Sequence, residues 1–241
     1  MTYLMASKEG LITGRSLARA LDVPFYGPRK LARALRRGRL PVSPHIRWGS
    51  GVAVDGAEVN DVHAVRLASD KLRSIKTWLA NGVPTLELVT IPPAFGRRIH
   101  HTKGRDIIIC RTEEEMAAAK DRVDYFTGLC YNESEFRVHI FGEEVIRVQH
   151  KVPRVEGANQ EIKNVDNGWG FRNVTPKSLE NRLYVVARNA VTALGLGFGA
   201  ADILYDGKEY RVLEVNTAPS LNDVGIERYL EHFRRWLEGV A

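Results

Sequence analysis

The stretch GAADILYDGKEYRVLEVNTAPSL, Gly199 to Leu221, decides the fold. Two runs of alternating apolar residues flank the turn-forming pair Asp206-Gly207, so the stretch predicts a β-hairpin. Within the second run, Glu214 and Asn216 share a face because side chains alternate along a strand. The pattern therefore predicts a carboxylate and an amide side by side on a strand that otherwise belongs to a hydrophobic core.

The length of the turn decides whether a third oxygen donor joins this pair. Directly opposed residues of an antiparallel pair share a face, so a turn of about three or five residues would place Asp202 beside Glu214 and Asn216. A turn of even length would place Asp202 on the other face. Three such hard donors suit Mg²⁺, whose remaining positions water and phosphate oxygens fill. The alternative is structural: Glu214 pairs with an arginine, and Asn216 begins the turn before Pro219.

The composition bounds the class of protein. The chain has 241 residues, 44% of them hydrophobic, which is enough for a sizeable core in one or two domains. Its two cysteines, Cys110 and Cys130, exclude a disulfide framework, and neither a secretory leader nor an apolar run of membrane-spanning length is recognised. We therefore expect a cytoplasmic protein without a membrane partner. These features do not determine its oligomeric state.

One short segment is strongly basic. The segment from Arg29 to Arg39 contains Arg29, Lys30, Arg33, Arg36, Arg37 and Arg39 and no acid, in a chain whose formal net charge is +6. Such a cluster predicts a docking surface for an acidic partner. The alternative is a solvated helix face that binds nothing.

The remainder of the chain indicates mixed α/β structure without internal repeats. The sequence AVRLASDKLRSIKTWLANGVP, from Ala64 to Pro84, predicts one helix that starts near Val62. Leu72, Ile75 and Leu79 recur on its buried face, and Asn81-Gly82 ends it.

Short strands are expected after this helix. Leu86 to Thr90 and Ile107 to Cys110 predict short strands, and a small helix should follow near Glu113. EFRVHIFGEEVIRVQHKV predicts two strands around Phe141-Gly142, in which apolar residues alternate with Arg137, His139, Arg147 and Gln149. The polar face of this strand pair is expected to be cationic.

Several motifs, in the correct order along the chain, resemble the ATP-grasp superfamily. DILYDGKEYRVLEVNTAP resembles its metal-binding signature, in which an acid on one strand precedes Glu-x-Asn on the next. SDKLRSIKTWLANGVP is similar to the entry helix of D-alanine:D-alanine ligases and of the ligases that add glutamate to a ribosomal protein. EFRVHIFGEEVI resembles the strand pair that carries an arginine toward the reacting phosphate. The resemblance spans roughly Asn60 to Leu221.

The resemblance implies an α+β fold of ATP-grasp type, in which two α+β subdomains sandwich the nucleotide. A short N-terminal α/β segment, residues 1–61, would precede an ATP-grasp domain of residues 62–241. Within that domain, residues 86–127 would form the central subdomain that covers the nucleotide. Residues 128–241 would form the C-terminal, metal-binding subdomain. The N-terminal segment is shorter than the domain that usually precedes this fold, so the acceptor site is not assigned.

The resemblance also implies roles for residues on the helix and the strand pair. Lys71 would reach the nucleotide phosphates. Arg137 would face the reacting phosphate, and Lys151 would be a further basic residue of the catalytic site. The metal ligands would be Asp202, Glu214 and Asn216.

The central subdomain departs from the family pattern. Where the family presents a phosphate-binding lysine, this chain has Arg97-Arg98, and Arg98 would replace the lysine because a guanidinium also binds phosphate. Arg97 would then point to the opposite face of the strand. Gly104 would contribute to a short backbone nest over phosphate. The adenine-binding hinge would lie at Tyr125 and Phe126.

The resemblance implies an ATP-dependent carboxylate-amine ligase. It would form an amide through an acyl phosphate, release ADP and phosphate, and use ATP with Mg²⁺, in two ions, or Mn²⁺. Its substrates would be a carboxylate and an amine acceptor, the latter a small molecule, a peptide or a protein. Two alternatives remain: a kinase of the same fold that releases a phosphorylated product, and a non-enzymatic module that binds an acidic polymer.

Overall fold

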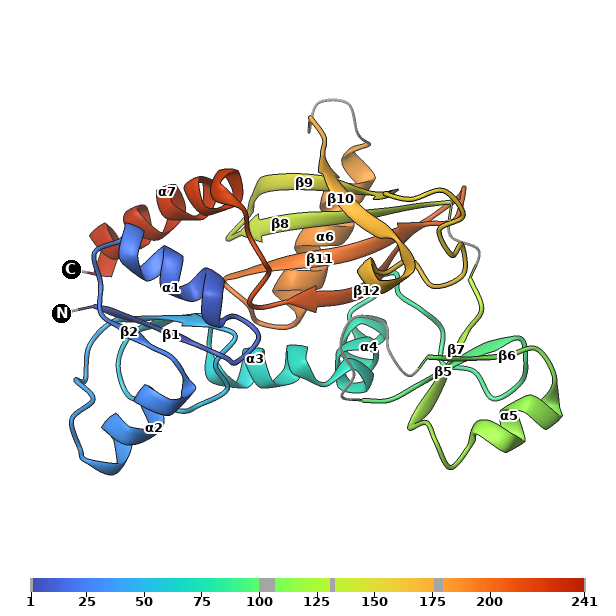
Figure 1. Ribbon diagram of the computed structural model, residues 1–241, viewed down its shortest axis with the longest axis horizontal. Coiled ribbons are helices and arrows are strands. Elements are labelled where there is room, and N and C mark those ends of the chain that lie inside the picture. Colours follow the sequence, from blue (N-terminus) through green and yellow to red (C-terminus); the bar gives the residue numbers. More distant parts are fainter. Residues whose placement is uncertain (1, 100–106, 131–132, 176–179, 241) are drawn as a thin grey trace.

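Three β-sheets follow one another along the chain in the computed structural model, which describes residues 2–99, 107–130, 133–175 and 180–240 (Figure 1). The first sheet is parallel, with the strand order β2-β1-β3-β4. Helices α1 and α2 connect its first three strands. The bounds are β1 (Tyr3–Ala6), α1 (Leu11–Ala20), β2 (Phe25–Tyr26), α2 (Pro28–Arg36), β3 (His45–Trp48) and β4 (Glu58–Val59).

The second sheet is small and antiparallel, with the order β6-β5-β7. Helix α5 packs on one of its faces and begins with a capping box, in which Thr112 and Glu115 bond to each other's backbone N–H. The bounds are β5 (Ala94–Arg97), β6 (Ile108–Cys110), α5 (Glu113–Ala119) and β7 (Tyr125–Gly128).

The third sheet is antiparallel and the largest, with the order β10-β9-β8-β11-β12. Helix α6 covers one face of this sheet, and the 3₁₀ turn η1 precedes β10. The bounds are β8 (Ser134–Phe141), β9 (Glu144–Pro153), η1 (Val165–Asn167), β10 (Trp169–Asn173), α6 (Asn181–Ala193), β11 (Phe198–Tyr205) and β12 (Tyr210–Asn216).

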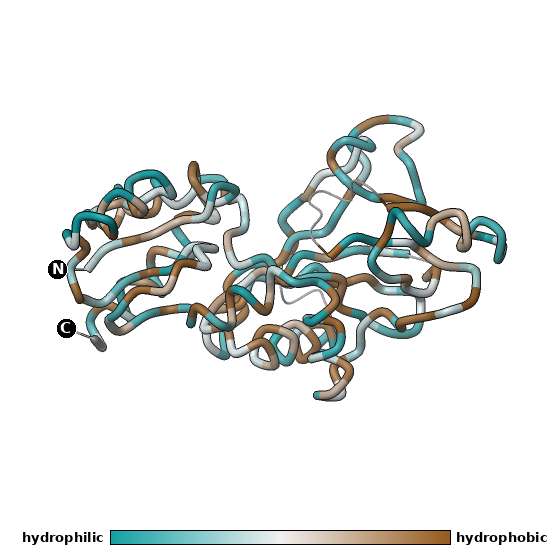
Figure 2. Tube along the Cα trace, turned by 90° about the horizontal axis from the view of Figure 1, so that it is seen from below, coloured by the Kyte–Doolittle hydropathy of each residue, from teal (hydrophilic) through white to brown (hydrophobic). Residues whose placement is uncertain are grey.

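The hydrophobic core beneath the large sheet is built from α6, from two helices that precede the second sheet, and from the inner face of the strands. Ile75 and Trp78 pack there with Leu183, Val138 and Val212, and each of these side chains is almost fully buried. Figure 2 shows hydrophobic and hydrophilic positions interspersed along the chain, as expected when only one face of each helix and strand is buried.

A second core joins the two ends of the chain. Helix α7 (Asp223–Val240) lies beside α1, and its Tyr229 and Phe233 pack against Trp48 of the first sheet and Phe198 of the large sheet. The N-terminal segment is therefore fixed to the C-terminal helix. The domain boundaries expected from the sequence stay predictions.

The single helix expected from Val62 is wrong, because the chain forms α3 (Val62–Ser69) and α4 (Lys71–Ala80). Asp70 separates them: its backbone is extended, and its carboxylate accepts a hydrogen bond from the N–H of Arg73 in α4. Leu79 is exposed rather than buried. The break places Lys71 at the first position of a new helix.

The strand expected at Leu86 to Thr90 does not form. The segment makes a single bridge from Leu88 to Thr127, and Thr85, just before it, makes one to Val212. It therefore connects α4 to the second sheet as an extended strap. Among the helices of the described residues, none combines the length and the apolar character that a bilayer crossing requires.

The decisive hairpin forms by a different route from the one expected. Tyr205 pairs with Tyr210, so the turn has the even length that should separate Asp202 from Glu214. A β-bulge at Leu213, where the register shifts, restores the alignment, and Asp202 pairs directly with Glu214. The turn length that the sequence left open is thus even, and the bulge, rather than an odd turn, places Asp202 beside Glu214.

His139 is not part of a cationic surface. It is fully buried, and its ring bonds to the hydroxyl of Tyr229 at 3.1 Å and to the side chain of Gln149 at 3.1 Å. Burial lowers the pKa of His139 to about 3, so the ring is neutral at physiological pH.

The buried His139 predicts a pH-dependent stability. Its folded pKa lies below the unfolded value of about 6.5, so the unfolded state binds the extra proton and stability falls as the pH falls. We expect a loss of about 2 kcal/mol between pH 6.5 and 5, which His139→Gln removes. Urea unfolding of both proteins across this range measures the effect. If the free energy of unfolding changed equally with pH in the two proteins, this prediction would be contradicted.

Candidate active site

A cleft of about 980 Å³ lies over the face of the large sheet that α6 leaves open, between this sheet, α4 and the second sheet. Loops from the first sheet and from the start of α7 close one end of it. Three rows of side chains cross its floor, and each is named here after its residue on β11: the Leu204 row, the Asp202 row and the Ala200 row.

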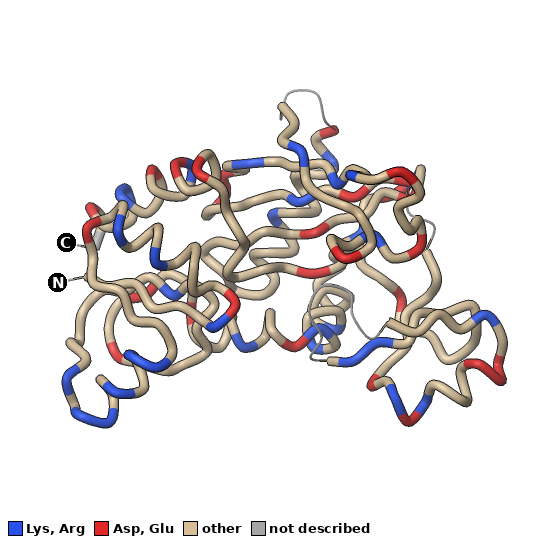
Figure 3. Tube along the Cα trace, viewed as in Figure 1, with Lys and Arg blue, Asp and Glu red and all other residues tan. Residues whose placement is uncertain are grey.

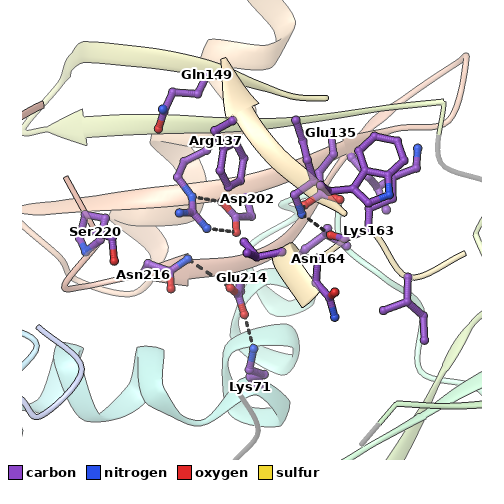
Figure 4. Close-up of a pocket in the computed structure, with 18 of the residues that line it drawn as sticks. Lys71, Glu135, Arg137, Gln149, Lys163, Asn164, Asp202, Glu214, Asn216 and Ser220 are labelled. Atoms are coloured by element: carbon purple, nitrogen blue, oxygen red, sulfur yellow. Dashed lines mark hydrogen bonds and ion pairs between the residues drawn. The ribbon is translucent and has the colours of Figure 1, made fainter. Parts of the chain in front are cut away.

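The Asp202 row crosses four strands. Gln149, Arg137, Asp202 and Glu214 are successive register partners from β9 to β12, so their side chains project from one face (Figure 4). The guanidinium of Arg137 binds both carboxylate oxygens of Asp202, at 2.6 and 2.7 Å. Lys71, at the start of α4, reaches across the cleft to form a salt bridge with Glu214.

The charges of this row stabilise one another. Burial raises the pKa of Glu214, but the nearby Lys71 and Arg137 outweigh it and hold that pKa at about 2. Burial lowers the pKa of Arg137, and Asp202 and Glu214 reverse this and raise it above its usual value. Glu214 and Arg137 are therefore ionised at neutral pH.

The Ala200 row lies two residues further along each strand. It consists of Arg147, the buried His139, Ala200 and Asn216. The amide of Asn216 donates to Glu214 at 3.2 Å, so these two side chains meet as expected from the hairpin.

The Leu204 row lies on the other side of the Asp202 row. Its members are Leu204, Glu135, Lys151 and Phe171. Leu204 is the register partner of Glu135, and Lys151 is the register partner of Phe171. Lys151 forms a salt bridge with Glu135 and donates to the carbonyl of Lys163 at 2.8 Å. Burial raises the pKa of Glu135, and Lys151 opposes this. Sequence reasoning did not identify Glu135, although it occupies the position two residues before Arg137 on the same face.

An apolar pocket continues from the Leu204 row toward the second sheet. Its walls come from both sheets and from α4, and consist of Ile75, Leu86, Phe95, Tyr125, Leu204 and Leu213. Burial raises the pKa of Tyr125 to about 12, so its phenol remains neutral. Phe126, the other expected hinge residue, lines a separate cavity of about 530 Å³ on the opposite face of β7.

Arg97, rather than Arg98, lines the cleft. Arg97 shares its face of β5 with Phe95, and its Nε donates to Thr127 at 2.9 Å, whereas Arg98 is exposed and does not line the cleft. Ala94 and Gly96 lie on the opposite face of β5, which packs against the small core of α5 and against Val123. This packing turns Arg97 toward the cleft. The expected orientation of this arginine pair is therefore wrong. Gly104 lies outside the described residues.

The arginine pair supplies a matched test. Burial lowers the pKa of Arg97, which indicates a cation held in a site where a bound anion would stabilise it. Arg97→Ala should weaken ATP binding by about 10- to 100-fold, the loss expected for charge-assisted hydrogen bonds. Arg98→Ala is the control and should change it less than about 2-fold. Calorimetric titration with a non-hydrolysable ATP analogue decides, and an equal effect of both variants would contradict the assignment.

The donor set of the hairpin fits a hard divalent cation. Among the described residues, no three histidine, cysteine, aspartate or glutamate side chains converge on one ion position. A metal at this point would therefore need the amide oxygen of Asn216 beside Glu214 and Asp202, an all-oxygen set that Mg²⁺ and Mn²⁺ accept. Lys71 and Arg137 now bond to the two carboxylates, so an ion would share these oxygens with them.

Comparison with curated proteins finds relatives that are named as ligases. The "Probable alpha-L-glutamate ligase" of Serratia proteamaculans is 25% identical over 212 residues, which cover 76% of this chain and 66% of that protein. The D-alanine–D-alanine ligase of Chromohalobacter salexigens is 26% identical over 224 residues, covering 79% and 70%. The chain thus spans about two thirds of the length of these relatives. No family model matches the chain.

Comparison with solved structures identifies the fold. The D-alanine–D-alanine ligase of Bacillus anthracis superposes with a TM-score of 0.72 at 12% identity, covering 97% of this chain and 92% of that one. The ATP-grasp ligase PsnB in complex with a minimal precursor gives 0.67 at 12% identity, covering 96% and 98%. The expected α+β fold of ATP-grasp type is confirmed. The chain therefore has an ATP-grasp fold and is similar in sequence to the glutamate and D-alanine–D-alanine ligases named above.

Proposed function

We propose that the protein is an ATP-dependent carboxylate-amine ligase that forms an amide bond and releases ADP and phosphate. The observation that carries this proposal is the Asp202 row with Lys71. It gathers two cations, two carboxylates and the neighbouring amide of Asn216 at the centre of one cleft. The names of the sequence relatives, glutamate ligase and D-alanine–D-alanine ligase, support the same reaction class.

The nucleotide fits along the rows. The apolar pocket between the two sheets suits an adenine ring. The Asp202 row suits the phosphate tail, because Lys71 and Arg137 bond to its carboxylates and Arg97 lines the same cleft. A Bacillus anthracis D-alanine–D-alanine ligase of the same fold was solved with ATP, at a TM-score of 0.71 and 13% identity. We place Lys151 between the apolar pocket and the Asp202 row, where it would contact phosphate or ribose oxygens.

Asp202, Glu214 and Asn216 would hold Mg²⁺ or Mn²⁺. When bound, such ions neutralise phosphate charge and orient the terminal phosphate for displacement. The chain's own cations act at the same place. Arg137, fixed by its two bonds to Asp202, presents a positive charge to the transferring phosphate, and Lys71 can exchange its bond with Glu214 for one with phosphate.

The proposed chemistry has two displacement steps. A substrate carboxylate oxygen attacks the γ-phosphorus, the bond to the β–γ bridging oxygen breaks, and ADP leaves an acyl phosphate. The amine nitrogen then attacks the acyl carbon, the carbon–oxygen bond to phosphate breaks, and the amine loses a proton as the amide forms. Neither step needs a side-chain nucleophile, so the residues serve to align the groups and to screen negative charge.

The nucleotide product tests this proposal. Carboxylic acids and amines, singly and in pairs, are incubated with ATP and Mg²⁺, and the nucleotides are separated by chromatography. The expected result is ADP release that depends on both an acid and an amine. Release of AMP and pyrophosphate would contradict the placement of the terminal phosphates beside Arg137 and Glu214.

The basic segment has the features of a docking surface for an acidic acceptor. Arg29, Arg33 and Arg36 form one stripe of α2, because they are spaced by four and three residues, and Leu31 on the opposite side of the helix is buried. All six cations of the segment are exposed, and among the described residues none forms a salt bridge. Figure 3 shows the basic positions gathered along α2 and the loop that follows it. We propose that it attracts an acidic peptide or protein substrate.

Charge reversal tests the basic segment. Replacing Arg33, Arg36 and Arg37 with glutamate should raise the KM for an acidic acceptor about 10-fold at low salt and flatten its salt dependence. ATP hydrolysis without acceptor should not change. Reversal of Arg228 and Arg234, exposed on α7, is the matched control. Unaltered acceptor kinetics at every salt concentration would leave the segment as a solvated surface.

A further inference from the structure

Arg147 on β9 is a buried cation whose hydrogen-bond partners are all neutral. The residue is 7% exposed. Its Nε and Nη2 donate to Oδ1 of Asn173 at 3.0 and 2.8 Å, and Nη2 also donates to Oδ1 of Asn222 at 2.9 Å. Among the described residues, its Nη1 donates to no partner. Nε and Nη2 are therefore engaged by the two asparagines, and the N–H groups of Nη1 are left for a ligand.

The surroundings of Arg147 supply no counter-charge. The charged or ionisable groups that act on it are Tyr229 and Arg137, and burial lowers its pKa. Glu9 lines the same cleft, but no salt bridge joins it to Arg147 within the described residues. In the other two rows, each charged side chain has an oppositely charged partner, as Arg137 has Asp202 and Lys151 has Glu135. A buried cation without an anion is costly, so its presence in a cleft points to an anionic ligand.

The position of Arg147 defines where that anion would lie. Arg147 belongs to the Ala200 row, on the side of the Asp202 row away from the apolar pocket. Two residues along a strand correspond to about 7 Å. A group bound by Arg147 would thus lie beyond the terminal phosphate of a nucleotide that occupies the other two rows, where the substrate must enter.

We infer that Arg147 binds a carboxylate of the substrate other than the one that is activated, so that the cleft selects an amino acid or a dicarboxylic acid. The inference rests on the proposed ligase function for the position of the nucleotide. The N–H groups of Nη1 can donate charge-assisted hydrogen bonds to a carboxylate, and this second carboxylate then sets the distance of the reacting group from Arg137.

The chain holds Arg147 in place from two sides. Asn222 also accepts a hydrogen bond from the N–H of Gly225 at 3.2 Å, in the first turn of α7. A Cβ at Gly225 would lie 2.3 Å from Nη1 of Arg147, so glycine leaves the room that the guanidinium occupies. Together with Asn173 on β10, these contacts fix the side chain before any substrate arrives, which lowers the entropic cost of binding.

The test is a comparison of carboxylates with their amides in the unmodified protein. Calorimetric titrations use L-glutamate against L-glutamine and L-isoglutamine, and D-alanine against D-alaninamide, with a non-hydrolysable ATP analogue and Mg²⁺ present. Wild-type protein should bind the carboxylate at least about 10-fold more tightly than the amide that lacks the recognised group. The glutamate series reports a carboxylate on the acid substrate, and the alanine pair reports one on the amine substrate.

Variants then assign the preference to Arg147. Arg147→Met should reduce the ratio of carboxylate to amide affinity to about 1. Arg147→Gln, which keeps a neutral side-chain donor, should do the same if the methionine variant is unstable. Arg172→Met is the matched control, because Arg172 is exposed and projects from the opposite face of β10 from Asn173. Its ratio should equal that of the wild type.

Two results would overturn the inference. One is a wild-type protein that binds every carboxylate no better than its amide. The other is a folded Arg147 variant that loses affinity for carboxylate and amide equally, since that would make Arg147 only a clamp between β10 and α7. These measurements need no turnover, so a failure of the ligase proposal is recognised separately, by the nucleotide product.

Discussion

Glu214→Gln is expected to reduce ATP turnover at least about 100-fold while the protein remains folded, a loss of a few kcal/mol of transition-state stabilisation. The change is nearly isosteric, and a glutamine oxygen still accepts a hydrogen bond from Lys71. It removes, however, the one carboxylate that lies next to both Asn216 and Asp202. Steady-state ADP release at saturating Mg²⁺ measures the effect.

The matched control for this variant is Glu209→Gln. Glu209 is exposed on the same hairpin and pairs only with Arg211 among the described residues. Its replacement should leave turnover within about 2-fold of the wild type, because an exposed ion pair contributes little. Near-normal turnover of a folded Glu214→Gln protein would refute the metal assignment.

Arg137→Met should cost both stability and activity. It leaves the carboxylate of Asp202, which is 4% exposed, without its bidentate partner. Breaking such a buried pair typically costs about 3–5 kcal/mol, because one charge stays buried without compensation. Urea unfolding without ligands measures this loss, and turnover should fall at least about 100-fold as well.

A double variant separates the two effects. Asp202→Asn added to Arg137→Met removes the stranded charge, so much of the lost stability should return while turnover stays low. Equal stability of the single and double variants would show that the pair is not coupled. Recovery of turnover in the double variant would contradict the role of Arg137 at the phosphate.

The hairpin shows what local patterns can and cannot predict. Alternation placed Glu214 and Asn216 on one face, and this holds in the structure. The pairing of Asp202 with Glu214 depends on the bulge at Leu213, and nothing in the local sequence distinguishes Leu213 from a regular strand residue. The resemblance of the motif to a known signature predicted the result, although the physical route to it was different.

The prediction that Arg98 faces the cleft failed for a related reason. In a short strand, the period of two predicts that Arg97 and Arg98 point in opposite directions but not which of them faces the cleft. The packing of Ala94 and Gly96 decides this, and it involves α5 and Val123, which lie later in the chain. The small residues at these two positions were the available signal.

Other parts of the site depend on contacts between distant segments. Arg147 becomes a buried cation only because Asn173 and Asn222 close over it, 26 and 75 residues later in the chain. Glu135 is recognised only through its salt bridge with Lys151. Likewise, the N-terminal segment shares a core with Tyr229 and Phe233 of α7, which no local periodicity predicts.

The most direct test of the account is interception of the activated acid. With an acid that stimulates ADP release, hydroxylamine replaces the amine, and the product is assayed as an acyl hydroxamate. The account predicts that hydroxamate accumulates in proportion to ADP, because an acyl phosphate reacts with this small nucleophile, and that Glu214→Gln abolishes both. ADP formation without any hydroxamate or amide, together with a stable phosphorylated product, would contradict it.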